Sequence, residues 1–233
     1  MIGLGKIMRK LLLLLSLLVF ALPTNADDKR SDPPKNLQKE PLFKDGQGYY
    51  SYKKPLDIAL PEGKVLIQYF YRYGCEVCLS GDDYLKLYAE RNRDKVVLVR
   101  SPAFEKWSEF TARMNATFIE FGRPDLSDKY LFDSASRKKE QSLVENNEAI
   151  QRWLAQNGVN IDQFYHTFSS AAVKKRVEQD LSLYQQYSPP INPIAILNGK
   201  YILIHNTLYN DDYTYAVLDF LVEKLQQEQQ ESK

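Results

Sequence analysis

The sequence predicts an α/β fold in which a block of helices interrupts a β-sheet. Two runs of β-branched and aromatic residues, at 65–71 and 95–100, are typical of buried strands. Residues 103–187 then place apolar side chains at the helical period of about 3.6 residues, with no convincing strand. Strand character returns at 194–197 and 201–204, on either side of an Asn-Gly pair that favours a hairpin turn.

The first half of the sheet is expected to contain a strand–helix–strand unit. A short aromatic strand is expected at 49–52. The first buried run breaks at Gly74, and apolar residues then recur at helical spacing from Cys78 to about Asn92. The second buried run follows and is expected to stop before Pro102. Both cysteines of the chain therefore lie at the turn that leads into the helix.

The remaining elements complete the predicted fold. The helical block begins, on its apolar spacing, with Phe104, Trp107 and Phe110. After the hairpin, a last helix is expected from about Asp211, and it is expected to fray into the polar tail at 226–233. This order of strands and helices is that of a thioredoxin-like fold with an inserted helical domain.

The N-terminal segment has the layout of a secretory signal peptide. Three basic residues precede an apolar run at 11–20, and small residues lead to a cleavage site after Ala26. The run is short for a membrane span, which needs about 20 residues, so we expect cleavage rather than an uncleaved anchor. Met1 and Met8 both qualify as the start of the chain. We expect export to the periplasm of a Gram-negative bacterium.

The expected organisation has five parts. They are the signal peptide at 1–26, a polar flexible leader at 27–42, thioredoxin-like parts at 43–102 and 188–233, and the helical insertion at 103–187. Removing the signal peptide takes away three basic and no acidic residues, which changes the formal charge from +1 to −2. A near-neutral chain gives no electrostatic case for binding nucleic acid or an anionic membrane.

The two cysteines, Cys75 and Cys78, are three positions apart. A disulfide stabilises a fold mainly by closing a long loop, and this loop is too short for that. In an oxidising compartment the pair is therefore better explained by a role in thiol chemistry than by a role in stability. The N–H groups and dipole at a helix N-terminus lower the pKa of a thiol, which favours Cys75 as the nucleophile and Cys78 as the more buried resolving thiol.

The residues alone leave two alternatives open for the pair. Besides redox chemistry, the pair could form half of a zinc site, or it could be chemically inert. A zinc site would need His166 and His205 as further ligands, and their spacing does not suggest one. With two histidines in the chain we expect no metal.

A proline stands just before the strand at 194–197, where it is costly unless the geometry requires it. A cis peptide bond between Asn192 and Pro193 fits this position and leaves backbone groups free to pair with a bound substrate chain. An ordinary trans proline is the alternative, because residues 189–190 are also prolines.

Three segments of the chain resemble the DsbA family of bacterial periplasmic disulfide oxidases. They are the opening at 43–55, the aromatic strand that runs into Cys75, and the proline strand and hairpin at 192–201, within a resemblance over roughly 43–225. The resemblance implies a thioredoxin fold with an inserted helical domain that donates disulfides to unfolded exported proteins. It also implies reoxidation by a DsbB-like membrane partner, and no cofactor beyond the disulfide of Cys75 with Cys78.

The residues between the cysteines depart from the family pattern. Carried over by position, Cys75 is the nucleophile, Cys78 the resolving cysteine and Pro193 the cis-proline. The family usually has Pro-His between its cysteines, whereas this chain has Glu76-Val77. A histidine that stabilises the thiolate is absent, and the Glu76 carboxylate brings a like charge. We therefore expect a weaker oxidant than the typical member.

Three further positions bear on the site. Many thioredoxin-like proteins carry a buried acid six residues before the nucleophile as a proton shuttle, and that position is Tyr69 here. Asn192 stands where the family usually has a β-branched residue, and its amide either contacts substrate or the thiolate, or serves only in a turn. Arg72, three residues before Cys75, either restores part of the missing positive charge or is a solvated strand end.

The leading function is a disulfide oxidase that acts on exported proteins. A periplasmic reductase or isomerase would use the same chemistry, but such proteins often carry an oligomerisation domain. Residues 27–40 are too short and polar to form one, so we expect a monomeric oxidase. A metal-binding or chaperone module that uses the same cysteines is an alternative from a different class.

Overall fold

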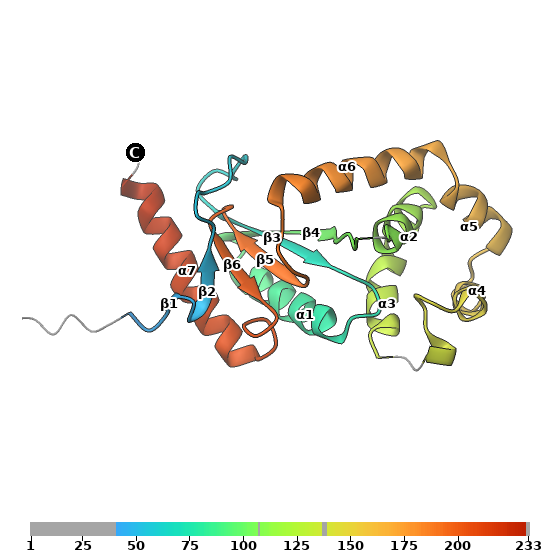
Figure 1. Cartoon of the computed structure of the whole chain (residues 1–233), viewed down its shortest axis with the longest axis horizontal. Helices are drawn as coiled ribbons and strands as arrows, with labels where there is room; N and C mark the ends of the chain where they lie inside the picture. The colour runs from blue at the N-terminus through green and yellow to red at the C-terminus, as the bar shows by residue number, and fades with distance from the viewer. Residues whose placement is uncertain (1–40, 107, 137–138, 232–233) are drawn as a thin grey trace, which may run out of the picture. The chain divides into compact units, whose positions relative to one another are not determined.

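A single β-sheet joins the two thioredoxin-like parts of the chain (Figure 1). The computed structural model describes residues 41–106, 108–136 and 139–231, and the predicted signal peptide and most of the predicted leader lie outside them. The strands within these residues are β1 (Lys44–Asp45), β2 (Gly48–Ser51), β3 (Val65–Tyr71), β4 (Val96–Pro102), β5 (Ile194–Leu197) and β6 (Tyr201–Ile204). Their order across the sheet is β1-β2-β6-β5-β3-β4.

Helices stand on both sides of this sheet and in a block between β4 and β5. They are α1 (Glu76–Arg91), α2 (Phe110–Glu120), α3 (Asp125–Ser134), the 3-10 helix η1 (Lys139–Gln141), α4 (Asn147–Gln156), α5 (Ile161–Phe168), α6 (Ala171–Tyr187) and α7 (Asp211–Glu231). Figure 1 shows α2 to α5 grouped beyond one end of the sheet, with α6 leading back toward β5. The prediction of an α/β, thioredoxin-like fold with an inserted helical domain is confirmed.

The strand β3 lies at the centre of the sheet, parallel to β4 and antiparallel to β5. All its side chains are buried, as expected for an apolar run without alternation. The turn between β5 and β6 is Asn198-Gly199, whose φ values of 47° and 64° fit the left-handed turn that this pair favours. The Oδ1 of Asn198 accepts a hydrogen bond of 2.7 Å from the Leu66 N–H, which ties this turn to β3.

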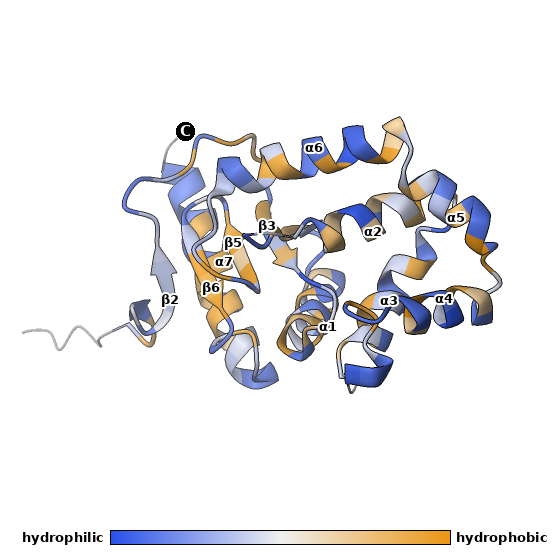
Figure 2. Cartoon of the chain, turned by 45° about the vertical axis from the view of Figure 1, so that its right-hand side comes forward, coloured by the Kyte–Doolittle hydropathy of each residue, from blue (hydrophilic) through white to orange (hydrophobic). Residues whose placement is uncertain are grey.

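The two faces of the sheet have separate apolar cores. Tyr69 belongs to the core formed with α1 and α7, whereas Phe70 belongs to a smaller core on the other face. There the Phe70 ring packs edge-on against Tyr184 and Tyr187 at the end of α6. Figure 2 shows the matching pattern, with hydrophobic β5 and β6 and an α6 that is hydrophobic on one side. The sheet is therefore held between the cysteine helix and the last helix of the insertion.

Three predicted boundaries are wrong, each for a physical reason. The helix expected from Phe104 begins at Phe110, because Phe104 turns to pack on Tyr184, with ring centroids 5.5 Å apart. The strand β4 continues through Pro102, since an edge strand tolerates a missing N–H. The helix α7 does not fray at 226 but continues to Glu231.

The end of α7 is held by a side chain that the polar composition of the tail did not reveal. Glu228 accepts hydrogen bonds from Lys200 Nζ at 2.7 Å and from the Tyr201 hydroxyl at 2.9 Å. Lys200 immediately precedes β6, and Tyr201 is its first residue. Among the described residues, no helix is long and apolar enough to cross a membrane.

Candidate active site

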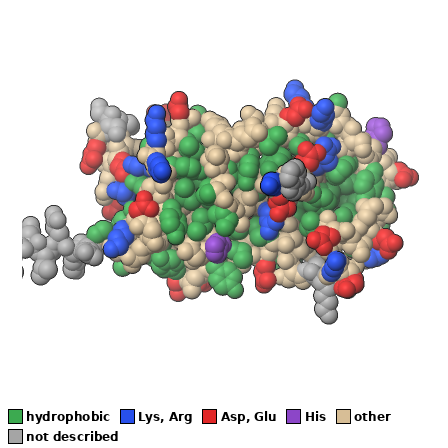
Figure 3. Space-filling view, in the orientation of Figure 1, with side chains coloured by type: hydrophobic (Ala, Val, Ile, Leu, Met, Phe, Trp, Pro, Cys, Tyr) green, Lys and Arg blue, Asp and Glu red, His purple; other side chains and the backbone are tan. Residues whose placement is uncertain are grey.

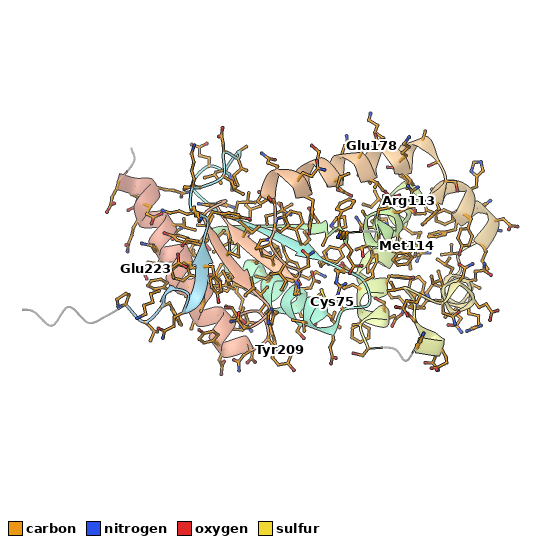
Figure 4. The ribbon with its side chains drawn as sticks, in the orientation of Figure 1. Cys75, Arg113, Met114, Glu178, Tyr209 and Glu223 are labelled. Atoms are coloured by element: carbon orange, nitrogen blue, oxygen red, sulfur yellow. A yellow bond between two sulfur atoms is a disulfide. The ribbon has the colours of Figure 1, made fainter. Side chains whose placement is uncertain are left out.

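The two cysteines lie at the start of α1, where Figure 4 labels Cys75. Cys75 is the N-cap residue, with extended backbone angles, and a disulfide joins it to Cys78. Its Sγ accepts a hydrogen bond of 3.1 Å from the Cys78 N–H. Cys75 keeps 9% of its surface exposed and Cys78 keeps 0%. A substrate thiol can therefore approach Cys75, whereas Cys78 is enclosed.

The loop before Cys75 is fixed by the helical insertion. Gly74 has a φ of 71°, a conformation that favours glycine. A Cβ on this residue would lie 2.7 Å from Cγ2 of Val144, so the close approach also excludes a side chain. The Gly74 N–H donates a hydrogen bond of 3.0 Å to the Ser134 hydroxyl at the end of α3. The insertion thus positions the loop before Cys75 directly.

Tyr69 of β3 contacts the backbone of the other cysteine, Cys78. Its hydroxyl donates a 2.7 Å hydrogen bond to the carbonyl of Cys78. Burial, and then the nearby Asp82 carboxylate, raise the pKa of Tyr69 well above its usual value. Tyr69 therefore stays a neutral donor, and it replaces a proton-shuttling acid with a fixed hydrogen bond.

A charge cluster built around one buried carboxylate, Asp82, lies next to Tyr69. Asp82 of α1 has 1% of its surface exposed, and Arg100 of β4 binds both of its carboxylate oxygens. Arg100 also donates to Asp128 of α3 at 2.8 Å. Lys86 contacts Asp82 and Asp128 at 2.8 and 3.0 Å. The cluster ties the cysteine helix to the sheet and to the insertion.

Sequence reasoning missed this cluster, although a signal was present. Asp82 falls one helical turn after Cys78 and one turn before Leu85, on the face of α1 that is buried. A charged residue at such a position needs a buried partner, because an unpaired charge there is costly. The pattern thus indicates a partner without telling which one.

The peptide bond between Asn192 and Pro193 is cis. Phe70 pairs with Ile194, so the antiparallel register brings Pro193 to the end of β3 that leads into Cys75. The Nδ2 of Asn192 donates a 2.9 Å hydrogen bond to the Tyr184 hydroxyl of α6. Its Oδ1 is buried and has no hydrogen-bond partner among the described residues. Asn192 is therefore anchored to the insertion rather than placed in a free turn.

Three other residues were predicted to tune the reactivity of Cys75, and they differ in exposure and in their contacts. Glu76 is exposed in the first turn of α1, and Val77 is partly buried against the main core. Arg72 forms an ion pair with Glu105, which follows β4. This pairing neutralises part of the positive charge that Arg72 brings to the site.

In the described part of the chain, no group of three or more His, Cys, Asp and Glu side chains is placed to hold a metal ion. Figure 3 shows cationic and anionic side chains interspersed on the face it presents. The arrangement can therefore support thiol–disulfide exchange through Cys75, with Cys78 as the internal partner.

Proteins similar to this chain include thiol:disulfide interchange proteins, although no protein-family model matches it. An uncharacterized protein of Haemophilus influenzae is 37% identical over 190 residues, which are 81% of this chain and 80% of that protein. The thiol:disulfide interchange protein DsbA of Pseudomonas syringae pv. tomato is 28% identical over 187 residues, 79% of this chain and 85% of the relative. The crystal structure of Pseudomonas aeruginosa DsbA has the same fold, with a TM-score of 0.63 and 24% identity over 79% of this chain and 95% of that one.

Proposed function

This chain belongs to the DsbA-like family of thiol:disulfide oxidoreductases, and from that premise we propose that it donates its disulfide to exported proteins in the periplasm. The observation that carries the proposal is the unequal access to the two sulfur atoms. Cys75 is the one that a substrate can reach, and Cys78 lies wholly inside. Such an arrangement lets a substrate thiolate attack Cys75 and leaves Cys78 as the thiol that re-forms the disulfide with Cys75.

The proposed exchange proceeds in two balanced steps. A substrate thiolate attacks Cys75 Sγ, the Cys75–Cys78 bond breaks, and Cys78 leaves with the electron pair as a thiolate. A second substrate thiolate then attacks the substrate sulfur of the mixed disulfide, and Cys75 leaves as a thiolate. The substrate loses two electrons and forms a disulfide, while the pair gains them and ends reduced.

The protein favours this direction by stabilising Cys75 as the leaving group. Its Sγ already accepts a hydrogen bond from the Cys78 N–H, and it lies at the positive end of the α1 dipole. Two features oppose that stabilisation. Glu76 adds a negative charge beside it, and Arg72 is engaged by Glu105. We therefore propose an oxidant that is milder than the typical family member.

The proposal extends to the partners of the reaction. The reduced pair would be reoxidised by a DsbB-like membrane partner, and the protein would act as a monomer with no cofactor other than its own disulfide. The signal-peptide pattern at 1–26 supports export, and the family supports a membrane partner.

Two single-cysteine variants test this assignment. The oxidised protein is mixed with a reduced, unfolded substrate protein, and free thiols and mixed disulfides are followed in time. The wild type should oxidise the substrate. Cys78→Ser, brought to reaction as a disulfide of Cys75 with glutathione, should accumulate a mixed disulfide with a substrate that has a single cysteine, because neither Cys78 nor a second substrate thiol can release it, whereas Cys75→Ser should neither oxidise nor trap substrate. Failure of the wild type to oxidise the substrate, with substrate binding unchanged in Cys75→Ser, would contradict the assignment and favour a binding module.

A further inference from the structure

Three hydrogen bonds connect Tyr69 of β3 to Cys75 through the first turn of α1. The Tyr69 hydroxyl donates to the Cys78 carbonyl at 2.7 Å. That carbonyl shares a peptide group with the Leu79 N–H, which donates to the Cys75 carbonyl at 3.1 Å. The Cys78 N–H, one peptide group earlier, donates to the Cys75 Sγ at 3.1 Å. The hydroxyl is therefore linked to both the backbone and the sulfur of Cys75.

The Tyr69 hydroxyl strengthens this turn as well as holding it. A donor on a carbonyl polarises the peptide group and makes the N–H of the same group a better donor, because hydrogen bonds in a chain reinforce one another. Tyr69 and Cys78 are both fully buried, so the bond lies in a medium of low dielectric, where it is stronger than in water. The hydroxyl thus helps to fix the turn whose Cys78 N–H faces the Cys75 Sγ.

The position of the hydroxyl depends on Gly81, one turn after Cys78 on α1. A Cβ on Gly81 would lie 2.9 Å from the Tyr69 hydroxyl oxygen, which is closer than real Cβ contacts. The next atoms of the described residues, Cβ of Leu208 at 3.4 Å and Cζ of Tyr69 at 3.5 Å, would be ordinary neighbours. Glycine is unfavourable inside a helix compared with alanine. The contact that calls for glycine here is therefore the hydroxyl.

We propose that Tyr69 is a positioning residue for the exchange, and that it acts through the first turn of α1 to stabilise the Cys75 thiolate. The inference rests on the proposed function, because it concerns the leaving group of the same exchange. A charged thiolate accepts a stronger hydrogen bond than a disulfide sulfur does. A turn that keeps the Cys78 N–H on the Cys75 Sγ therefore favours the reduced pair and makes the protein a better oxidant. Gly81 leaves the room that this arrangement needs.

Tyr69→Phe tests the proposal, because it removes the hydroxyl and keeps the buried ring. Two quantities are measured: the pKa of the Cys75 thiol in the reduced protein, from thiolate absorbance against pH, and the equilibrium constant of the pair with glutathione. The variant should raise the pKa of Cys75 and shift the constant by about three- to tenfold toward the oxidised protein, the range of one hydrogen bond. A purely structural role would weaken the oxidised and reduced proteins alike and leave both quantities unchanged.

Tyr88→Phe is the matched control. It removes another tyrosine hydroxyl of the same core, one that donates to Asp219 at 2.9 Å from the last turns of α1. Any loss of stability in this variant should leave the pKa of Cys75 and the glutathione constant unchanged.

Gly81→Ala assigns the effect to the contact with the hydroxyl. Alone, it should displace the hydroxyl from the Cys78 carbonyl and weaken the oxidant in the same direction as Tyr69→Phe. In the Tyr69→Phe protein the added methyl group meets only ordinary neighbours, so Gly81→Ala should change the constant little further. The two single variants test one bond from its two sides, so either decides the proposal if the other does not fold.

Two results would overturn the inference. The first is a glutathione constant that Tyr69→Phe leaves unchanged or shifts toward a stronger oxidant. The second is an equal effect of Gly81→Ala with and without the Tyr69 hydroxyl, because the glycine would then act by another route. Both results leave the proposed function intact as long as the wild type oxidises its substrate. Failure of the wild type to exchange thiols with glutathione or with a substrate would count against both.

Discussion

Glu76 occupies the first turn of α1 with its side chain in solvent, directly after Cys75. Reduction of the disulfide creates a thiolate beside this carboxylate, and the repulsion disfavours the reduced form. Because Arg72 is paired with Glu105, the site offers only part of a compensating charge. We therefore propose that this one exposed residue shifts the redox equilibrium of the Cys75–Cys78 pair.

Replacing Glu76 with Gln should make the protein a stronger oxidant. Loss of the like charge stabilises the reduced pair, and we expect the equilibrium constant against glutathione to shift by about two- to fivefold, because an exposed charge is screened. Titration in glutathione buffers measures the shift. Glu90→Gln, which removes an exposed carboxylate at the other end of α1, is the control and should change nothing. An unchanged constant in Glu76→Gln would contradict the role given to this residue.

Asp180 of α6 should make stability depend on pH. Burial raises its pKa from 3.8 to about 6, although Arg176 opposes the shift, and its Oδ2 has no hydrogen-bond partner among the described residues. The folded state therefore binds a proton before the unfolded state does as pH falls. As pH falls from about 7 to about 4, protonation of Asp180 increasingly stabilises the folded state. This stabilisation is lost as pH rises through 6.

Asp180→Asn should accordingly stabilise the protein at pH 7, by about 1 kcal/mol for a partly exposed group, and have little effect near pH 4. Urea unfolding at the two pH values measures the difference. An equal effect at both would show that the charge of Asp180 does not oppose folding.

At the scale of elements, the charge cluster joins α1, β4 and α3. Its members are 18 and 28 residues apart, measured from Arg100 to Asp82 and to Asp128. The pairing holds the cysteine helix, the sheet edge and the insertion in one arrangement. A buried ion pair of this kind adds little net stability compared with an apolar contact, but breaking it exposes the cost of the charge left behind.

Arg100→Met should therefore destabilise the protein strongly. Asp82 would keep only Lys86 as a partner while remaining almost fully buried, and we expect a loss of about 3 kcal/mol in the free energy of unfolding. Urea denaturation of the oxidised protein measures it. Arg123→Met removes an exposed ion pair with Asp125 and should change the free energy of unfolding far less. Similar losses in both variants would argue against a structural role for the cluster.

The elements differ in how far sequence alone could predict them. The strands β3, β5 and β6 agree with their predicted bounds, because runs of β-branched and aromatic residues with an Asn-Gly turn specify them locally. The start of α2 was wrong because Phe104 is held by Tyr184, far along the chain. Local sequence patterns predict the strands and helices, whereas contacts between distant elements determine where some of them begin.

At the scale of the whole molecule, the site is assembled from both thioredoxin-like parts and the insertion. The sequence singled out Cys75, Cys78 and Pro193, because spacing and backbone chemistry mark them. It did not reveal Ser134 and Tyr184, which hold Gly74 and Asn192 from the insertion. Those partners are ordinary polar residues, and only the tertiary fold brings them to the site.

The redox state of the pair in living cells tests the central claim most directly. Free thiols are trapped in acid with a bulky alkylating agent, and the shift in gel mobility counts the reduced cysteines. Cys75→Ser and Cys78→Ser supply the standard for one free thiol. An oxidase should have Cys75 and Cys78 mostly oxidised, and mostly reduced once its membrane partner is removed. A pair that is mostly reduced in otherwise normal cells would contradict the account and identify a reductase or isomerase instead.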